Sequence, residues 1–157
     1  MVGFAPPVTY SADEVKIWNL LIYNDFHAFC KGDWEMIQND FAEKEFYAIH
    51  SNKSNIKIDW SLKYDSLSVY REDWLRQSKE FLRLDFRLNP LEILFASTKL
   101  AKIEIKEDMA LVHKEFNGAF ELKGADTVLF DWISLFTLRK FDSDWKIIGF
   151  VGYLPKH

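Results

Sequence analysis

Two side chains in the last third of the chain, Asp131 and His113, are of types that could carry acid–base chemistry. Asp131 stands between Phe130 and Trp132, and a carboxylate that loses solvent among aromatic rings is suited to act as a general acid or base. The alternative is an exposed aspartate near a strand end or a structural hydrogen-bond acceptor, because acidic residues are seldom buried.

His113 stands between Val112 and Lys114 in a segment of strand character, where an imidazole could relay a proton near neutral pH. Its face of the strand, shared with Leu111, Glu115 and Asn117, is more polar than the opposite face with Val112 and Phe116. His113 could therefore face solvent or a dimer partner instead of a cavity.

Aromatic side chains supply candidate walls for a small-molecule site, because tryptophan and tyrosine combine a large apolar area with a polar group. Aromatic residues at helical spacing also form ordinary protein cores, so both interpretations stay open. The candidate ligand-binding residues of this kind are Trp18, Tyr23, Tyr47, Trp60, Trp74 and Trp132.

The sequence shows no motif for a metal or a cofactor. Its four histidines and one cysteine have no HxxxH or CxxC spacing. Glycine-rich phosphate loops, a GxSxG turn and a Cys–His pair are missing as well. We therefore expect neither a metal ion nor a cofactor.

Length and composition favour one domain over residues 1–157, with residues 1–10 as a flexible N-terminal segment. The net charge of −4 argues against nucleic acid as a partner, because phosphate binding needs an excess of cations. Cys30 is the only cysteine, so no intramolecular disulfide can form. Without a recognisable secretory signal or an apolar run of membrane-spanning length, we expect a soluble, cytoplasmic protein that does not bind membranes.

The first half of the chain reads as helices. Ser11 and Glu14 form a capping box, and the helix that follows is expected to end at Lys31 and Gly32. Asp33 can cap a second, short helix to about Phe41. A third helix is expected to begin at Ser66 or Ser68 and to continue no further than Pro90.

The remaining segments read as strands. Residues 45–51 and 56–62 are expected to pair as a hairpin. From Lys102 onwards apolar and polar residues alternate with a period of two, interrupted by turns at 107–108, 123–126 and 142–144. The order, helices first and an antiparallel meander last, predicts an α+β fold.

The Gly32-Asp33-Trp34 break and the terminal hairpin around Asp142-Ser143-Asp144 are the most specific parts of this pattern. From Ala12 to Leu154 the chain resembles the nuclear transport factor 2-like superfamily, and within it the SnoaL-like and ketosteroid-isomerase-like proteins. The resemblance implies a cystatin-like cone: three N-terminal helices packed on a strongly curved, mixed but mostly antiparallel sheet, with a pocket between them. It also implies a homodimer formed through the outer face of the sheet.

The catalytic residues of ketosteroid isomerases can be tested by counting from Gly32 and, for the penultimate strand, back from Phe141-Asp142. Their oxyanion-binding tyrosine corresponds to Asp25, their carboxylate base falls near Ile49, and the acid of the penultimate strand falls on Thr137. All three positions depart from the family pattern. If Thr137 points into the pocket as the count implies, alternation places Asp131 there as well.

Two functions remain open on this basis. The first is a small-molecule-binding domain of the SnoaL-like type that need not be catalytic. The alternative is a cofactor-independent isomerase, dehydratase or cyclase that acts on a small hydrophobic substrate, with Asp131 or His113 as the acid–base group.

Overall fold

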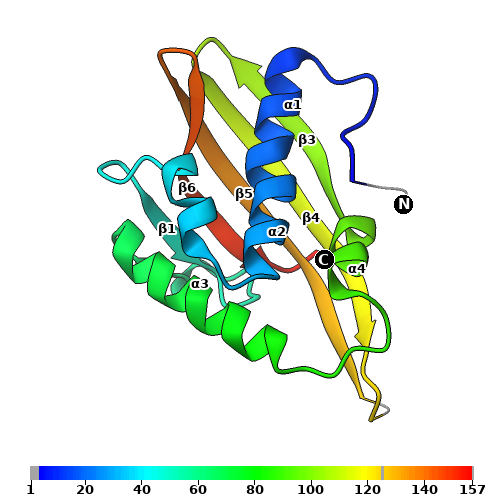
Figure 1. The fold of residues 1–157 in the computed structure, drawn as a ribbon. Helices are drawn as coiled ribbons and strands as arrows, with labels where there is room; N and C mark the ends of the chain where they lie inside the picture. Colours follow the sequence, from blue (N-terminus) through cyan, green and yellow to red (C-terminus); the bar gives the residue numbers. More distant parts are fainter. Residues whose placement is uncertain (1–3, 125, 157) are drawn as a thin grey trace.

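The computed structural model describes residues 4–124 and 126–156, and it shows helices packed on a single six-stranded sheet (Figure 1). The strands follow one another across the sheet in the order β2-β1-β6-β5-β4-β3. Only β1 and β6 pair in parallel, and every other pair is antiparallel. The strands are β1 (Tyr47–His50), β2 (Ser61–Tyr64), β3 (Thr98–Lys106), β4 (Met109–Glu121), β5 (Thr127–Phe141) and β6 (Asp144–Leu154).

The helical run at the start of the chain begins where its capping box predicts. Ser11 accepts a hydrogen bond from the Glu14 backbone, and the Glu14 carboxylate accepts one from Ser11. The run consists of α1 (Ala12–Trp18), a π-helical segment η1 (Asn19–Asn24) and α2 (Asp25–Phe29). Gly32 follows with a φ of 67°, a left-handed conformation that suits glycine after a helix.

The second helix predicted from Asp33 to about Phe41 is not formed. Two short 3₁₀ turns, η2 (Trp34–Met36) and η3 (Gln38–Asp40), replace it. Asp33 caps the first turn as expected, by accepting a hydrogen bond from the Glu35 backbone. Between the turns Ile37 has φ −123° and ψ 0°, outside the helical region, so the two cannot merge.

The third predicted helix is α3 (Leu67–Leu82), capped by Ser66. An additional helix, α4 (Pro90–Ser97), was not predicted. Pro90 begins this helix rather than only limiting the previous one, because a proline in the first turn has no amide hydrogen to leave unpaired. Asn89 caps α4 by accepting a hydrogen bond from the Leu91 backbone.

The C-terminal meander has the strands and turns that the period of two predicts. β1 and β2 pair as the expected antiparallel hairpin, although both are shorter than predicted. A 3₁₀ turn, η4 (Lys57–Asp59), takes up the first part of the segment that was expected to be the second strand.

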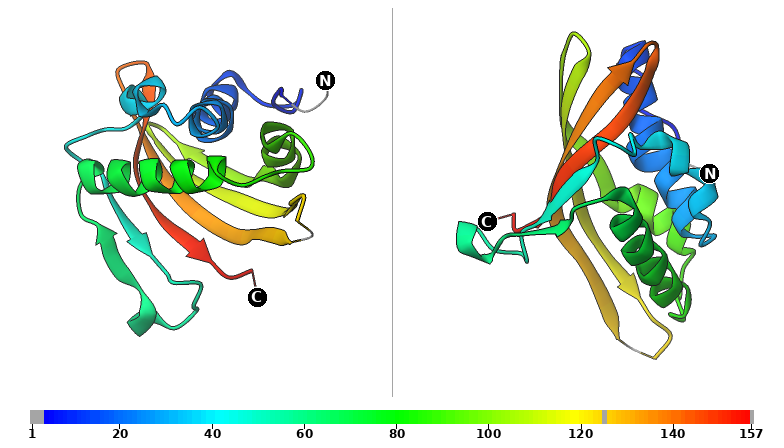
Figure 2. Two further views of the ribbon diagram at one scale, coloured as in Figure 1. Left: turned by 60° about the horizontal axis from the view of Figure 1, so that its bottom comes forward. Right: turned by 90° about the vertical axis from the view of Figure 1, so that its left-hand side faces the viewer.

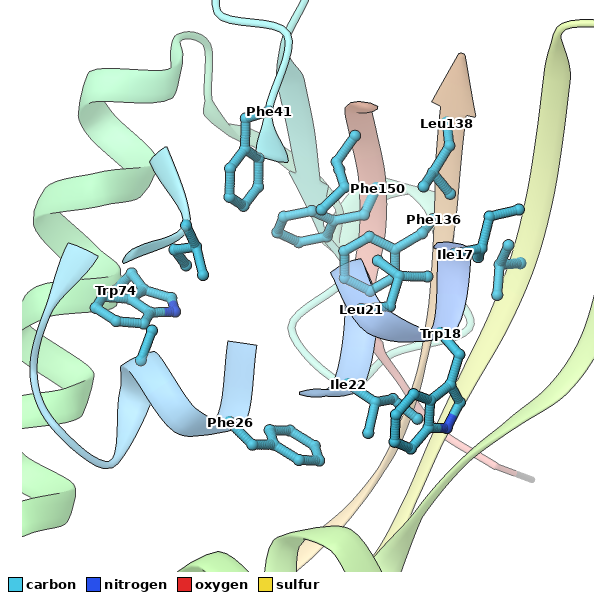
Figure 3. Packing of buried hydrophobic residues seen from close by; sticks show 14 of the residues in the cluster. Ile17, Trp18, Leu21, Ile22, Phe26, Phe41, Trp74, Phe136, Leu138 and Phe150 are labelled. Atoms are coloured by element: carbon cyan, nitrogen blue, oxygen red, sulfur yellow. The ribbon is translucent and has the colours of Figure 1, made fainter. Parts of the chain in front are cut away.

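The α-helices lie on one side of the bent sheet, and the hairpin of β1 and β2, with η4 at its tip, projects away from them (Figure 2). The core fills the space between the helices and the concave face of the sheet. The rings of Trp74 and Phe26, on the helices, enter the same interior region as those of Phe136 and Phe150, on the sheet (Figure 3). This architecture confirms the predicted α+β fold.

The segment predicted to be flexible, residues 1–10, is described from Phe4 onwards. The Phe4 ring stacks on Phe95 of α4 with centroids 4.2 Å apart, and Tyr10 packs against the core. Residues 1–3 lie outside the described residues. Within residues 4–124 and 126–156, no helix combines the length and apolar character needed to cross a bilayer.

Candidate functional site

A cavity of about 460 Å³ lies between α2, α3 and the concave face of the sheet. Its wall is mostly aromatic, with a few polar side chains. The apolar lining residues are Phe26, Phe29, Trp74, Phe81, Leu84, Leu94, Phe116, Phe130, Trp132, Phe136 and Phe150; the polar ones are Asp25, Tyr70, Gln77, Glu80, Lys114, Ser134 and Tyr153. The size and composition are those of a small-molecule site.

Strand register determines which side chains of β4 and β5 face the cavity. The two strands pair without a bulge, and Lys114 lies directly opposite Ser134, while Phe116 lies opposite Trp132. Because side chains alternate between faces, the inward set of β5 is the even-numbered one, including Phe136. A lysine thus stands in the middle of a wall of aromatic rings.

Lys114 and Asp25 form an ion pair at the cavity wall. The Lys114 Nζ lies 3.2 Å from Asp25 Oδ2, and the Lys114 side chain is only 3% exposed, against 27% for that of Asp25. Burial lowers the pKa of Lys114 from its ordinary value, and the negative charge of Asp25 opposes that shift. The Trp74 indole donates to Asp25 Oδ1 over 3.1 Å and fixes the other carboxylate oxygen.

The π-helical segment η1 provides a further partner for this lysine. Lys114 Nζ donates to the Leu21 carbonyl, which lies within η1. In a regular α-helix the Asp25 amide would donate to that carbonyl, but here it donates to Ile22. The altered helix therefore presents a carbonyl to a buried ammonium, and π-helical turns of this kind are frequent at functional sites.

Two hydroxyl groups on the wall remain available to a ligand. Among the residues that the structure describes, neither the Tyr70 nor the Ser134 hydroxyl makes a hydrogen bond to another residue. Burial, and then the negative charge of Asp25, raises the pKa of Tyr70 well above its ordinary value, so its hydroxyl stays protonated and can donate. We call Asp25, Tyr70, Trp74 and Lys114 the buried polar cluster.

A second group of polar side chains surrounds Asp73 on α3. Asp73 accepts hydrogen bonds from the Tyr64 hydroxyl and from the Gln77 amide, the latter over 2.9 Å. Tyr153 lies 3.5 Å from the same amide and lines the cavity. Its φ of 62° is unusual for a residue with a side chain, and it occurs where β6 slips in register against β5, so a bulge turns this ring toward the cavity.

A small second cavity of about 20 Å³ adjoins the first one. Asp25, Tyr70, Lys114 and Phe136 line both cavities and so separate them. A volume of this size can hold one water molecule where polar partners are present.

The structure contradicts the predicted orientation of Asp131 and Thr137. Neither lines the cavity, and the Asp131 side chain is 62% exposed and pairs with Lys156 over 3.0 Å. The count back from Phe141-Asp142 placed Thr137 inward, one residue out of step with the observed alternation, since Phe136 faces the cavity. His113 also points away from the cavity, because it precedes the inward Lys114.

Two of the predicted aromatic residues, Trp74 and Trp132, lie on the cavity wall. The other four do not line it. Trp18 is buried in the core, and Trp60 donates from its indole to the Ser54 carbonyl. Tyr23 and Tyr47 are 39% and 58% exposed. A ligand-binding role for Trp74 and Trp132 stays a prediction.

Of the buried polar cluster, sequence reasoning named only Trp74 and missed Asp25, Tyr70 and Lys114, although two signals pointed to them. Lys114 interrupts the apolar set Val112, Phe116 and Phe120 at two-residue spacing, and a lysine on the inward face of a strand calls for a buried partner. Asp25 occupies the position of the oxyanion-binding tyrosine and was treated only as a departure from the family pattern.

Comparison with known proteins supports the fold and not a specific function. No protein-family model matches the sequence, and no curated protein is significantly similar to it. Solved structures of similar shape are numerous. An NTF2-like protein of unknown function from Shewanella baltica OS155 is 15% identical, with a TM-score of 0.57, over 92% of this chain and 95% of that one.

Two further structures agree in architecture. A conserved protein from Planctomyces limnophilus DSM 3776 is 13% identical with a TM-score of 0.59, over 91% of this chain and 95% of that one. A domain of unknown function with a cystatin-like fold from Nostoc punctiforme PCC 73102 is 18% identical with a TM-score of 0.59, over 91% and 77% of the two chains. The chain thus has the NTF2-like, cystatin-like fold, as predicted, while the SnoaL-like branch stays a prediction.

Proposed function

We propose that this protein binds a small, flat and mostly hydrophobic molecule in the 460 Å³ cavity, and that the molecule carries a hydrogen-bond acceptor such as a carbonyl oxygen. One observation carries the proposal: a buried ammonium, Lys114, stands in a cavity wall that is otherwise mostly aromatic. Aromatic walls favour flat apolar ligands, and a few polar groups orient them.

The polar groups of the wall favour an acceptor on the ligand. The Lys114 ammonium has three donors, and the two partners it has among the described residues are Leu21 and Asp25. Tyr70 and Ser134 add hydroxyl donors. The carboxylate of Asp25 is already occupied by Lys114 and Trp74. A ligand with an acceptor group therefore matches this cavity better than a ligand with a cation.

Tryptophan fluorescence provides a direct test, because Trp74 and Trp132 line the cavity. Titration with 2-naphthylmethanol or 2-acetylnaphthalene is expected to change the emission and to saturate, with a dissociation constant on the order of 100 µM, as for fragment-sized ligands. Replacing Trp132 by Phe should remove much of the response. If these compounds and a wider panel of flat aromatic molecules give no saturable change, the proposal is wrong.

The buried polar cluster also favours a second candidate function, a cofactor-independent enzyme that uses acid–base catalysis. Asp25 and Lys114 are a carboxylate and an amine 3.2 Å apart, and Tyr70 lines the same cavity. These are the group types that transfer protons in enzymes, and they stand where a ligand would lie. Turnover of a bound ligand that is lost in Asp25→Asn would distinguish this candidate from simple binding.

Homodimerisation through the outer face of the sheet remains part of this proposal, as does a cytoplasmic location. The outer face carries exposed apolar side chains, among them Leu111 and Leu129, 40% and 66% exposed. Contact with another copy of the chain would remove these side chains from water. Light scattering coupled to size-exclusion chromatography is expected to give the mass of a dimer, and Leu111→Glu is expected to give the monomer.

A further inference from the structure

Lys114 is the most unusual residue of the molecule. Its side chain is 3% exposed, and its Nζ lies 4.8 Å from the centre of the Phe26 ring, 5.1 Å from that of Phe116 and 5.6 Å from that of Phe136. Asp25 is its sole anionic partner among the described residues, and that carboxylate is shared with Trp74. A structural ion pair has no need of a cavity beside it, but this one lines a space large enough for a ligand.

This environment is the one in which a lysine becomes a nucleophile. Desolvation in an apolar pocket favours the neutral amine, which is the reactive form, and a neighbouring carboxylate can take the proton. Burial lowers the pKa of Lys114 and outweighs the opposing charge of Asp25, in agreement with the geometry. Exposed lysines on the same sheet, such as Lys102, which pairs with Glu104 in solvent, lack both features.

We propose that Lys114 forms an imine with a small aldehyde or ketone held in the cavity. The inference rests on the proposed function and deepens it, because it makes the acceptor on the ligand a carbonyl group whose carbon is the point of attack. The aromatic rings hold the flat body of the compound, and the buried polar cluster supplies the groups that the reaction needs.

The step balances without any further reagent. Asp25, 3.2 Å from Nζ, accepts a proton from the Lys114 ammonium. The amine lone pair then forms a bond to the carbonyl carbon, and the carbonyl oxygen takes up the proton to give a carbinolamine. A second proton then moves from the nitrogen to this hydroxyl group. The C–O bond breaks, water leaves, and the nitrogen lone pair forms the C=N bond of a protonated imine. One ammonium and one carbonyl thus yield one iminium and one water.

The residues around Lys114 can accommodate the protonated imine, the carbonyl oxygen and the released water. The protonated imine keeps its positive charge, so it remains paired with Asp25. Tyr70 and Ser134 offer hydroxyl donors to the carbonyl oxygen; Ser134 lies directly opposite Lys114 in the sheet register. The 20 Å³ cavity beside Lys114, Asp25 and Tyr70 has room for the single water that is released.

Reductive trapping tests the proposal on the purified full-length protein. With 2-naphthaldehyde and sodium cyanoborohydride, peptide mapping by mass spectrometry is expected to find one naphthylmethyl group on Lys114. We expect this labelling to saturate with aldehyde concentration and to be at least about tenfold faster than that of Lys102, because the cavity holds the aldehyde beside Nζ and so raises its effective concentration there. The non-reactive 2-naphthylmethanol should compete with it.

Two variants and one parallel measurement separate the possible outcomes. Lys114→Arg keeps the positive charge but cannot form an imine, and Lys114→Met removes the charge; both are expected to lose the fast labelling while Lys102 is labelled as before. Circular dichroism verifies that each variant is folded.

If 2-naphthylmethanol binds but Lys114 is labelled no faster than Lys102, the imine is refuted and the binding function stands. If neither compound occupies the cavity, both inferences fail for this class of ligand.

Discussion

Lys114 Nζ lies 3.2 Å from Asp25 Oδ2, and this contact joins the middle of the sheet to the first helical run. The lysine is almost fully buried, whereas a quarter of the Asp25 side chain is exposed. The Lys114 ammonium has lost nearly all of its hydration, so its charge is stabilised mainly by Asp25. The Asp25 carboxylate is still partly hydrated, so it relies less on Lys114. This asymmetry leads to the first prediction.

Removing the anion should destabilise the fold more than removing the cation. Asp25→Asn leaves the buried Lys114 ammonium without a counter-charge, which is expected to cost about 3 kcal/mol. Lys114→Met leaves Asp25 partly exposed and still bonded to Trp74, so a smaller loss is expected. Urea unfolding at neutral pH measures both. Equal losses in the two variants would contradict the asymmetry.

The stability of the wild-type protein should depend on pH through Lys114. Because folding lowers the pKa of this lysine, the unfolded chain binds the proton more tightly than the folded one. The free energy of unfolding is therefore reduced by the full amount below the folded-state pKa. This reduction disappears as the pH rises through the unfolded-state value of 10.5. Wild type should therefore gain free energy of unfolding relative to Lys114→Met between neutral pH and about pH 10.

The comparison with Lys114→Met is necessary because tyrosines act in the opposite direction. Burial raises the pKa of Tyr70, so the stability that its protonated form contributes is complete below its unfolded-state value of 10.0 and is lost at higher pH. Tyr70 is present in both proteins, so its contribution cancels in the difference. A difference in free energy that stays constant over this pH range would show that Lys114 keeps its ordinary pKa.

Filling the cavity should abolish ligand binding without unfolding the protein. Ser134 is buried and faces the cavity, so Ser134→Met places a flexible apolar side chain in the space proposed for the ligand. The affinity for 2-naphthylmethanol is expected to fall at least about tenfold, while the stability changes by about 1 kcal/mol. Thr137→Met, on the opposite face of the same strand, is the matched control and should bind as wild type does.

Asp131 and His113 should be dispensable for binding. The Asp131 side chain is 62% exposed and pairs with Lys156 away from the cavity, and His113 lies on the face of β4 that is turned away from the cavity. Asp131→Asn and His113→Gln are therefore expected to leave the affinity for 2-naphthylmethanol within about twofold of wild type, as surface changes usually do. A loss in either variant comparable with that of Ser134→Met would place the ligand outside the described cavity.

The fold was predictable because its signals are local. Ser11 and Glu14 define a helix start through two hydrogen bonds within three residues, and the alternation in β4 and β5 persists over more than ten residues. The helix predicted after Asp33 failed because Ile37 leaves the helical region, and no local signal marks that break. Helix α4 was missed because Pro90 was taken only as a stop signal.

The site was harder to predict because it depends on contacts between distant segments. Asp25 and Lys114 are 89 residues apart in the sequence, and nothing in either neighbourhood identifies the other as its partner. The orientation of Asp131 depended on the parity of one count back from Phe141-Asp142, and an error of one residue exchanges the two faces of a strand. A lysine on an otherwise apolar strand face is the signal that would have identified the cavity.

A last prediction concerns the strand pair that supports two residues of the cavity wall. Gly149 of β6 lies beside Tyr47 of β1, and a Cβ atom at Gly149 would overlap the Tyr47 carbonyl oxygen. Since that oxygen is backbone and cannot turn aside, Gly149→Ala must separate the two strands, at an expected cost of about 3 kcal/mol. The same strand carries Phe150 and Tyr153, so ligand affinity should fall as well.

Gly124 provides the matched control for this substitution. A Cβ at Gly124 would meet no atom within 4 Å, and its φ lies outside the left-handed region, so Gly124→Ala should unfold at the same urea concentration as wild type or at a slightly higher one. Gly149→Ala should unfold at a clearly lower concentration with an unchanged slope, because the same surface is exposed on unfolding. Equal midpoints for the two variants would mean that β1 does not pair closely with β6 at Gly149, and the parallel contact that completes the sheet would have to be placed elsewhere.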